Sequence, residues 1–507
     1  MTRSRKAMIP FLVVFTLVGS VALWAQNLAE FEKRVASFTL ANGMKFIVVE
    51  RHDAPVVSMI TFADVGSVNE TKGITGIAHI FEHMAFKGTN TIGTKDLAKE
   101  LECMKKEDQA FARLRAEEIK GTRADPKVID ALRKEYDEAK TAAKQFVVNN
   151  EFAEAIEKAG GVGLNAFTSY DFTGYTSSFP SNKLEMWFSM ESDRFLNPCL
   201  REFYTEKDVI MEERRMSVDN RPVGKLFEEF GHLAFLAHPY GEPIIGHMSD
   251  LKAISREKAE QFFRKNYTAS NLTAVIVGDV DPAQCRAWAE TYFGRLPLQP
   301  KPDPVVTEEP PQRGERRVTL ELQSQPYLVI GYHVPDFNDV ATVKFDVLND
   351  IVSGGRSSRL YRKLVKEKKI AISVGTWSGY PGSKYPNLYS FYALPAQGHT
   401  AEECEVAIIE EIEKLRNEPV TPEELEKAKI RTRSELVNSL ATNEQIAYNI
   451  AYYEMLAGNW REMFRRGLDK LPGVTAADIR ELAKTYFVPG NRSVALIRTA
   501  AGSEAKQ

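Results

Sequence analysis

The chain has few histidines and few cysteines for its length, and neither sign of charge is in excess. Its 507 residues include 8 histidines and 4 cysteines. Lys plus Arg (66) nearly balances Asp plus Glu (69), and neither sign gathers in long runs, so nothing indicates the basic surface of a nucleic-acid-binding protein. We therefore expect no nucleic-acid partner. Beyond the N-terminal segment there is no apolar run long enough to span a bilayer.

The four cysteines lie far apart and form no C-x-x-C pair. They are Cys103, Cys199, Cys285 and Cys404. A chain of this size does not depend on disulfides for stability, even if it is exported. We interpret them as buried or free thiols and not as metal ligands, and their disulfide state stays open.

The N-terminus has the pattern of an export signal. Arg3, Arg5 and Lys6 precede an apolar run from Met8 to Trp24, and Ala25 is a plausible last residue of the signal. Leu23 is larger than the residue usually preferred before a cleavage site, so an uncleaved anchor is the alternative. We expect an exported protein, periplasmic or otherwise extracytoplasmic, with residues 1–25 as its signal peptide.

The rest of the chain divides into two parts. With 43% hydrophobic residues it has enough material for at least two cores. A proline-rich and charged stretch predicts a linker at residues 296–316, between domains at 26–295 and 317–507. Lys/Glu/Ala-rich sequence at about 102–157 predicts a helical hairpin inserted in the first domain.

An internal repeat relates the two parts. Tyr267 and Asn271 match Phe487 and Asn491 at one constant offset, each within a helix, a turn and an apolar strand. We therefore predict two homologous α+β domains, each a largely antiparallel sheet packed with helices.

His79-Ile80-Phe81-Glu82-His83 is the segment that carries chemistry. Residues four apart share a helix face, so His79 and His83 can bind one ion with Zn–N bonds of roughly 2.0–2.1 Å. Glu82 stands beside them and is suited to take a proton from water. The pattern predicts the metal helix of a zinc hydrolase.

A catalytic zinc usually has three protein ligands and one open position. The other histidines, at positions 52, 232, 238, 247, 333 and 399, are expected in loops or at strand edges, without ligand-like pairing. A carboxylate is therefore the better third ligand. The segment from Glu206 to Arg215 offers Glu206, Glu212 and Glu213, and composition alone does not choose among them.

The sequence resembles the pitrilysin family of inverted zincin metallopeptidases, in the two-domain form of the mitochondrial processing peptidase subunits. The matching segments are Asn42-Gly43, Gly66-Ser67, Gly76 to Thr89, Leu164 to Thr168, Glu206 to Glu213, Tyr267 to Asn271, Val277 to Val280, and Ser353 to Leu360. They extend over nearly the whole chain after the signal.

The resemblance implies a role for each site residue. His79, His83 and Glu213 are the expected ligands of one Zn²⁺ per chain, Glu82 is the general base, and Glu206 supports the site. The segment Asn165-Ala166-Phe167 resembles the family's edge strand, to which an extended peptide substrate adds.

The resemblance also shows a departure. Many members supply an Arg-x6-Tyr pair from the C-terminal half, but the corresponding positions here hold Val365 and Ile372. Neither side chain can donate a hydrogen bond to a developing oxyanion. Because the family closes its chamber with four such domains, we expect a second two-domain subunit, either a different one bearing the Arg and Tyr or a second copy of this chain.

The sequence thus predicts an exported zinc endopeptidase that acts on peptides or small unfolded polypeptides. The alternative is a non-catalytic peptide-binding or assembly subunit of a peptidase complex. The complete set of His79, Glu82, His83 and Glu213 disfavours that alternative, because a binding subunit needs no general base.

Overall fold

The computed structural model of the protein describes residues 30–500. The predicted signal peptide, residues 1–25, lies outside them. Between these limits no helix combines the length and the apolar character that crossing a bilayer requires.

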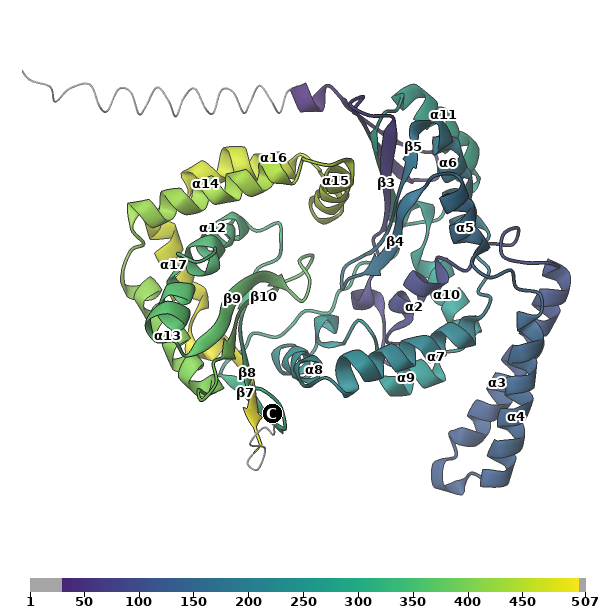
Figure 1. Cartoon of the computed structure of the whole chain (residues 1–507), viewed down its shortest axis with the longest axis horizontal. Coiled ribbons are helices and arrows are strands. Elements are labelled where there is room, and N and C mark those ends of the chain that lie inside the picture. Colours follow the sequence, from purple (N-terminus) through teal and green to yellow (C-terminus); the bar gives the residue numbers. More distant parts are fainter. Residues whose placement is uncertain (1–29, 501–507) are drawn as a thin grey trace, which may run out of the picture.

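Two mixed β-sheets form the centres of two similar halves (Figure 1). The first contains β1 (Val35–Thr39), β2 (Lys45–Glu50), β3 (Val56–Ala63), β4 (Val162–Thr168), β5 (Thr173–Pro180) and β6 (Leu272–Gly278). The second contains β7 (Arg316–Leu322), β8 (Tyr327–Val334), β9 (Ala371–Tyr380), β10 (Asn387–Pro395) and β11 (Arg492–Thr499). The strand orders are β1-β2-β6-β3-β5-β4 and β7-β11-β8-β10-β9.

The two sheets share one topology. Apart from β1, the strands follow the same order, and the pairs β2–β6 and β7–β11 are parallel while the other described pairs are antiparallel. The helix α10 (Arg256–Asn266) precedes β6 just as α17 (Ala476–Tyr486) precedes β11. The predicted α+β fold with two homologous halves is confirmed.

Each half also contains helices. In the first half these are α2 (Ile77–Met84), α3 (Leu97–Glu118), α4 (Pro126–Lys144), α5 (Glu151–Lys158), α6 (Leu184–Leu196), α7 (Phe203–Arg214), α8 (Pro222–Ala234), α9 (Met248–Ala253), α10 and α11 (Pro282–Tyr292). In the second half they are α12 (Ala341–Ser353), α13 (Ala401–Asn417), α14 (Pro422–Asn438), α15 (Asn443–Ala457), α16 (Glu462–Arg465) and α17.

The halves exchange one helix each, which joins them through buried contacts. The helix α15 of the second half packs on β3 and β6, where Ile446 and Ile450 meet Ile60 and Val275 of the first sheet (Figure 1). The helix α8 packs in the same way on β7 and β11 of the second sheet. A sheet with two apolar faces needs a cover on each. Each half therefore completes the core of the other.

The predicted helical hairpin is present as α3 and α4, which project from the first half (Figure 1). Asp96 accepts a hydrogen bond from the backbone N–H of Lys99 and caps α3, while Asp125 and Pro126 begin α4. At the middle of α3, buried Arg256 donates to Asp108 at 2.7 Å and pairs with Glu107. This ion pairing fixes the hairpin to α10.

Candidate metal centre

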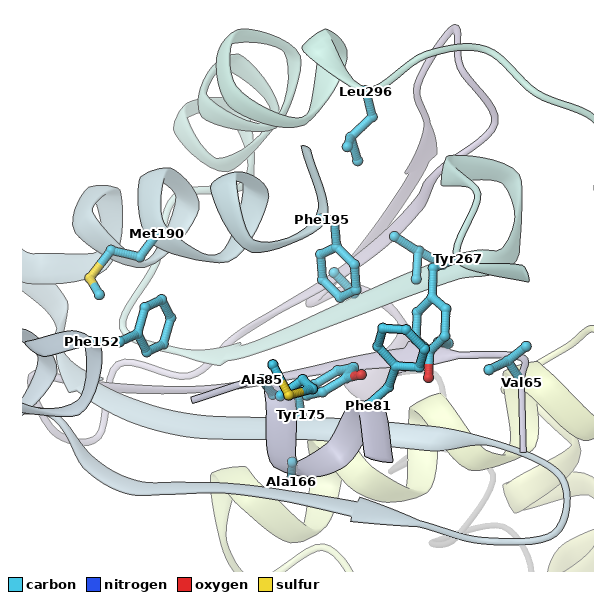
Figure 2. Packing of buried hydrophobic residues seen from close by; sticks show 14 of the residues in the cluster. Val65, Phe81, Ala85, Phe152, Ala166, Tyr175, Met190, Phe195, Tyr267 and Leu296 are labelled. Carbon is cyan, nitrogen blue, oxygen red and sulfur yellow. The ribbon is translucent and has the colours of Figure 1, made fainter. Parts of the chain in front are cut away.

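The helix α2 carries the predicted metal motif and is held at its first turn by a buried carboxylate. Glu70 accepts hydrogen bonds from the backbone N–H groups of Gly76 and Ala78, both at 2.7 Å. These are donors that a helix start leaves without partners. The opposite face packs into the first core, where the ring of Phe81 lies 5.3 Å from that of Tyr267 (Figure 2). Both contacts fix the rotation of α2, and with it the direction of its histidines.

Two imidazoles and one carboxylate converge at this helix. The Nε2 atoms of His79 and His83 lie 3.9 and 3.6 Å from Oε2 of Glu213, which is on α7. Zinc bonds of roughly 2.0–2.2 Å at tetrahedral angles place neighbouring donors roughly 3.3 Å apart. The three donors are thus close to the spacing that one zinc ion requires, and two imidazoles with a carboxylate are a ligand set that zinc takes.

The orientation of α7 separates Glu213 from its neighbour Glu212. Glu212 pairs with Arg215 at 2.7 Å and faces solvent. Arg214, the buried residue that follows Glu213, donates both guanidinium nitrogens to Glu228 of α8 at 2.8 and 3.0 Å. This two-point contact fixes the end of α7. The structure therefore brings Glu213, and not Glu212, to the two histidines.

His79 is suited to act as a ligand because its surroundings keep it neutral. Burial, helped by the nearby His83, lowers the pKa of His79 to about 4. Its Nδ1 atom is buried without a hydrogen-bond partner among the described residues. Because its pKa lies below neutrality, the imidazole is uncharged at neutral pH and one ring nitrogen has an electron pair with which to bind an ion.

Glu206 contacts the other side of His83. Its Oε2 lies 3.5 Å from Nδ1 of His83, and its Oε1 lies 2.6 Å from Nζ of Lys87. Burial opposes ionisation of Glu206, but His83 and Lys87 outweigh that effect and lower its pKa. An ionised Glu206 favours a proton on Nδ1, which leaves Nε2 of His83 facing the centre.

Replacing Glu206 by glutamine is expected to weaken zinc binding by about 10–100-fold, because the tautomer and orientation of His83 lose their support. A competition titration with a coloured chelator measures this. Glu202→Gln is the matched control, since Glu202 also contacts Lys87, at 3.2 Å, but among the described residues it forms no ion pair with His83. Equal losses in the two variants would assign the effect to Lys87 instead.

Glu82 lies beside the three converging groups. One of its oxygens is 3.9 Å from Nε2 of His79, and Thr168 at the end of β4 faces it. Burial raises the pKa of Glu82, while Thr168 and His83 partly oppose the shift. A carboxylate with a raised pKa is a better proton acceptor near neutrality than an exposed one.

A cavity of about 470 Å³ opens in front of these groups. His79, Glu82 and Glu213 line it together with Phe167 and Thr168 of β4. Of the predicted substrate-binding residues, Phe167 therefore reaches the cavity, whereas Ala166 is buried and Asn165 is exposed. The strand β4 is the last in its sheet, so no strand among residues 30–500 pairs with its outer edge.

Aromatic residues from both halves also line this cavity, here called the aromatic wall, and sequence reasoning missed them. Tyr170, Phe227 of α8 and Tyr380 of β9 line the cavity, and the rings of Phe227 and Tyr380 lie 5.8 Å apart. They are distant in sequence and form no motif. Only the exchange of α8 between the halves brings Tyr380 to the first half, and no local pattern signals it.

Many members of the resembling family have an Arg and a Tyr where this chain has Val365 and Ile372, and neither of these apolar residues can replace them. Val365 packs against the second core and Ile372 is exposed. Nearby Arg359 is mostly buried and donates to both oxygens of Glu424, at 2.8 and 2.7 Å. That ion pair gives Arg359 a structural role within the second half.

Two other expectations concern histidine and cysteine. The four cysteines are free thiols, three of them buried, as expected. The expectation that the remaining histidines lack ligand-like pairing is wrong for His232 and His247. Their rings stack with centroids 5.4 Å apart, and both face Glu242. One histidine lies on α8 and the other at the start of α9, beyond a loop, so their spacing in the sequence does not indicate that they lie together.

Comparison with known proteins gives two family matches and several relatives. "Insulinase (Peptidase family M16)" matches residues 45–115 and 141–247, and "Peptidase M16 inactive domain" matches residues 253–432. The unmatched residues between 115 and 141 lie in the α3–α4 hairpin. The chain is similar to the zinc protease PqqE of Helicobacter pylori, with 26% identity over 424 residues that cover 82% of each chain.

Solved structures have the same fold. A protease from Helicobacter pylori aligns with a TM-score of 0.76 at 24% identity, over 92% of this chain and 99% of that one. The periplasmic protease PqqL from Escherichia coli aligns at 16% identity with a TM-score of 0.68, over 92% of this chain and 47% of PqqL. A chain of complex III2 from Candida albicans aligns with a TM-score of 0.67 at 15% identity, over 91% and 95%.

These matches cover both halves of the chain, and the histidine pair with its carboxylates lies inside the first of them. The curated relatives include a protein named as a zinc protease, and a chain of a larger complex shares the fold. The chain belongs to the peptidase M16 family, the insulinase and pitrilysin family, in its two-domain form.

Proposed function

We propose that the chain is an exported zinc-dependent endopeptidase that hydrolyses peptides or small unfolded polypeptides. The observation that carries the proposal is the convergence of His79, His83 and Glu213, with Glu82 beside them at the same cavity. A zinc ion held by these three residues would act as a Lewis acid, which acidifies water and stabilises negative charge on a substrate oxygen.

The other residues of the site have separate roles in the proposed reaction. Glu82 accepts the proton of the attacking water and later delivers it to the departing amine. Glu206 holds His83 in the orientation that frees its Nε2 atom. Thr168 and the aromatic wall line the cavity on which the reacting groups lie.

The open edge of β4 supports a peptide as the substrate. An extended peptide can add to an unpaired strand edge through backbone hydrogen bonds. Asn165 is exposed on this edge, and the strand ends at Thr168, which faces Glu82. A peptide bound along β4 would therefore lead to the metal centre, and the aromatic wall favours apolar side chains near the cleaved bond.

Digestion of a peptide library by the purified chain tests this function. Cleavage is expected to stop when a chelator removes zinc and to return when zinc is added back, because the Lewis acid is lost and restored. Mass spectrometry of the products gives the cleavage positions. Undiminished cleavage by protein shown to be free of metal would contradict the proposal.

Export and pairing are further parts of the proposal. The predicted signal peptide supports export, and PqqL, described as periplasmic, shares the fold. Because this chain matches about half of PqqL, the PqqL chain has room for a second pair of domains. With Val365 and Ile372 in place of an Arg–Tyr pair, we propose that a second two-domain subunit completes the site.

Size-exclusion chromatography with light scattering checks the pairing. Hydrolytic activity is expected to elute with a dimer, either of this chain or with a different co-purified subunit, because the oxyanion donor comes from the partner. Mixing Glu82→Gln protein with the wild type distinguishes self-pairing from a different partner. Full activity in a fraction that contains only monomer would remove the pairing proposal.

A further inference from the structure

A second group of metal-ligand side chains lies outside the centre described above. The Oε2 atom of Glu242 lies 2.7 Å from Nε2 of His247 and 3.9 Å from Nε2 of His232. The donors of all three residues lie within 4.8 Å of one another. Donors on one tetrahedral zinc ion are roughly 3.3 Å apart, between the two distances seen here.

The two stacked imidazoles set this group apart from the other histidine pairs. His52 with Asp279 and His399 with Glu403 are single histidines beside single carboxylates, at 2.8 and 2.6 Å, on the surface. Such pairs are ordinary surface contacts. His232 and His247 instead direct Nε2 atoms from two elements, α8 and the start of α9, at one carboxylate oxygen. Among the described residues only this group and the first centre bring three such ligands together.

The position of the group connects it to the candidate metal centre. Glu242 and His247 are the two ends of the short loop 243–246, and Pro243, Ile244 and Ile245 of this loop line the cavity. An ion that joins both loop ends to His232 would therefore tie this wall of the cavity to α8.

The same loop touches the start of α2. The backbone N–H of His247 donates to Oγ1 of Thr75 at 2.9 Å, and the carbonyl of Gly246 accepts from buried Arg214 at 2.7 Å. A Cβ atom on Gly246 would lie only 2.2 Å from the backbone oxygen of Thr75, so the loop and the helix start are in close contact. Movement of the loop would disturb the base of the metal helix.

We propose that His232, Glu242 and His247 bind a second divalent ion of the zinc type, which fixes the loop 243–246 against α2. The ion takes no part in the hydrolysis, because its ligands do not line the cavity. Its role is to hold one wall of the cavity in place. Lys72, whose Nζ lies 3.4 Å from Oε1 of Glu242, is exposed and can move aside when the ion binds.

The test counts zinc in protein whose first centre has been removed. Untagged protein with His79→Ala and His83→Ala is dialysed against zinc and analysed by mass spectrometry of the metal. About one ion per chain is expected, and about none after His232→Gln and His247→Gln are added. His399→Gln in the same background is the matched control and should leave the count unchanged.

Amide hydrogen exchange tests the same site without relying on the double glutamine variant. Zinc is expected to slow amide hydrogen exchange in residues 242–247 of the protein that lacks the first centre, and Glu242→Gln should remove this protection. If the double glutamine variant does not fold, this measurement on Glu242→Gln replaces it.

Absence of zinc from the background protein, or a count that survives His232→Gln and His247→Gln, would overturn the proposal. So would an unchanged exchange rate in the loop. None of these readouts requires peptide cleavage, so a failure of the proposed peptidase activity is seen separately.

Discussion

Replacing Glu82 by glutamine is expected to lower kcat/KM for peptide hydrolysis by about 10²–10⁴-fold, the usual contribution of a general base. Glutamine has almost the same shape as glutamate but cannot accept the proton of the attacking water. Because the proposed ligands are His79, His83 and Glu213, the zinc content should not change. Steady-state kinetics on a cleaved library peptide and metal analysis of the same sample measure the two quantities.

The control for this variant is Glu212→Gln, which removes the same charge from a side chain that pairs with Arg215 and faces solvent. It should keep both activity and zinc. Unchanged hydrolysis in the Glu82 variant would refute the mechanism and favour the alternative of a non-catalytic binding subunit. Loss of zinc in that variant would show that Glu82 is a ligand and not the base.

The sequence predicts what is local or repeated. His79, Glu82 and His83 follow from the geometry of one helix turn, since residues four apart must share a face. The repeat between Tyr267 and Phe487 predicts two homologous halves, and both sheets have the same strand order. In each case the information lies within a short segment or in a comparison of two such segments.

The contacts between distant segments do not follow from the sequence. Nothing in α8 or α15 signals that each covers the sheet of the other half, because an amphipathic helix shows that it is buried but not against which partner. Tyr380 reaches the cavity through this exchange. The parallel pairing of β2 with β6 does not follow from the sequence either, since strand pairing depends on the path of the whole chain.

The third ligand is predicted only in part by the local sequence and depends in part on contacts between distant segments. The sequence presents Glu206, Glu212 and Glu213 on one helix, and the resemblance selects Glu213. In the structure the rotation of α7 about its axis decides which of these glutamates face the histidines. The contact of Arg214 with Glu228 fixes that rotation. Glu206 reaches Nδ1 of His83, and Glu213 faces Nε2 of both histidines.

Removing Glu213 is therefore expected to have the second large effect. Glu213→Ala should weaken zinc binding by more than the 10–100-fold typical of losing a supporting residue, because a ligand itself is lost. Hydrolysis at limiting zinc should fall with it. The measurement is a chelator competition titration in protein that also carries His232→Gln and His247→Gln, so that only the first centre reports.

Glu212→Ala is the matched control, one position away on the same helix, and should leave zinc affinity unchanged. The comparison tests the rotation of α7 directly, because a turn by one residue would exchange the roles of Glu212 and Glu213. Equal zinc affinity in both variants would show that neither carboxylate binds the ion. Glu206 would then be the remaining carboxylate of α7 near His83, and its variant should show the larger loss.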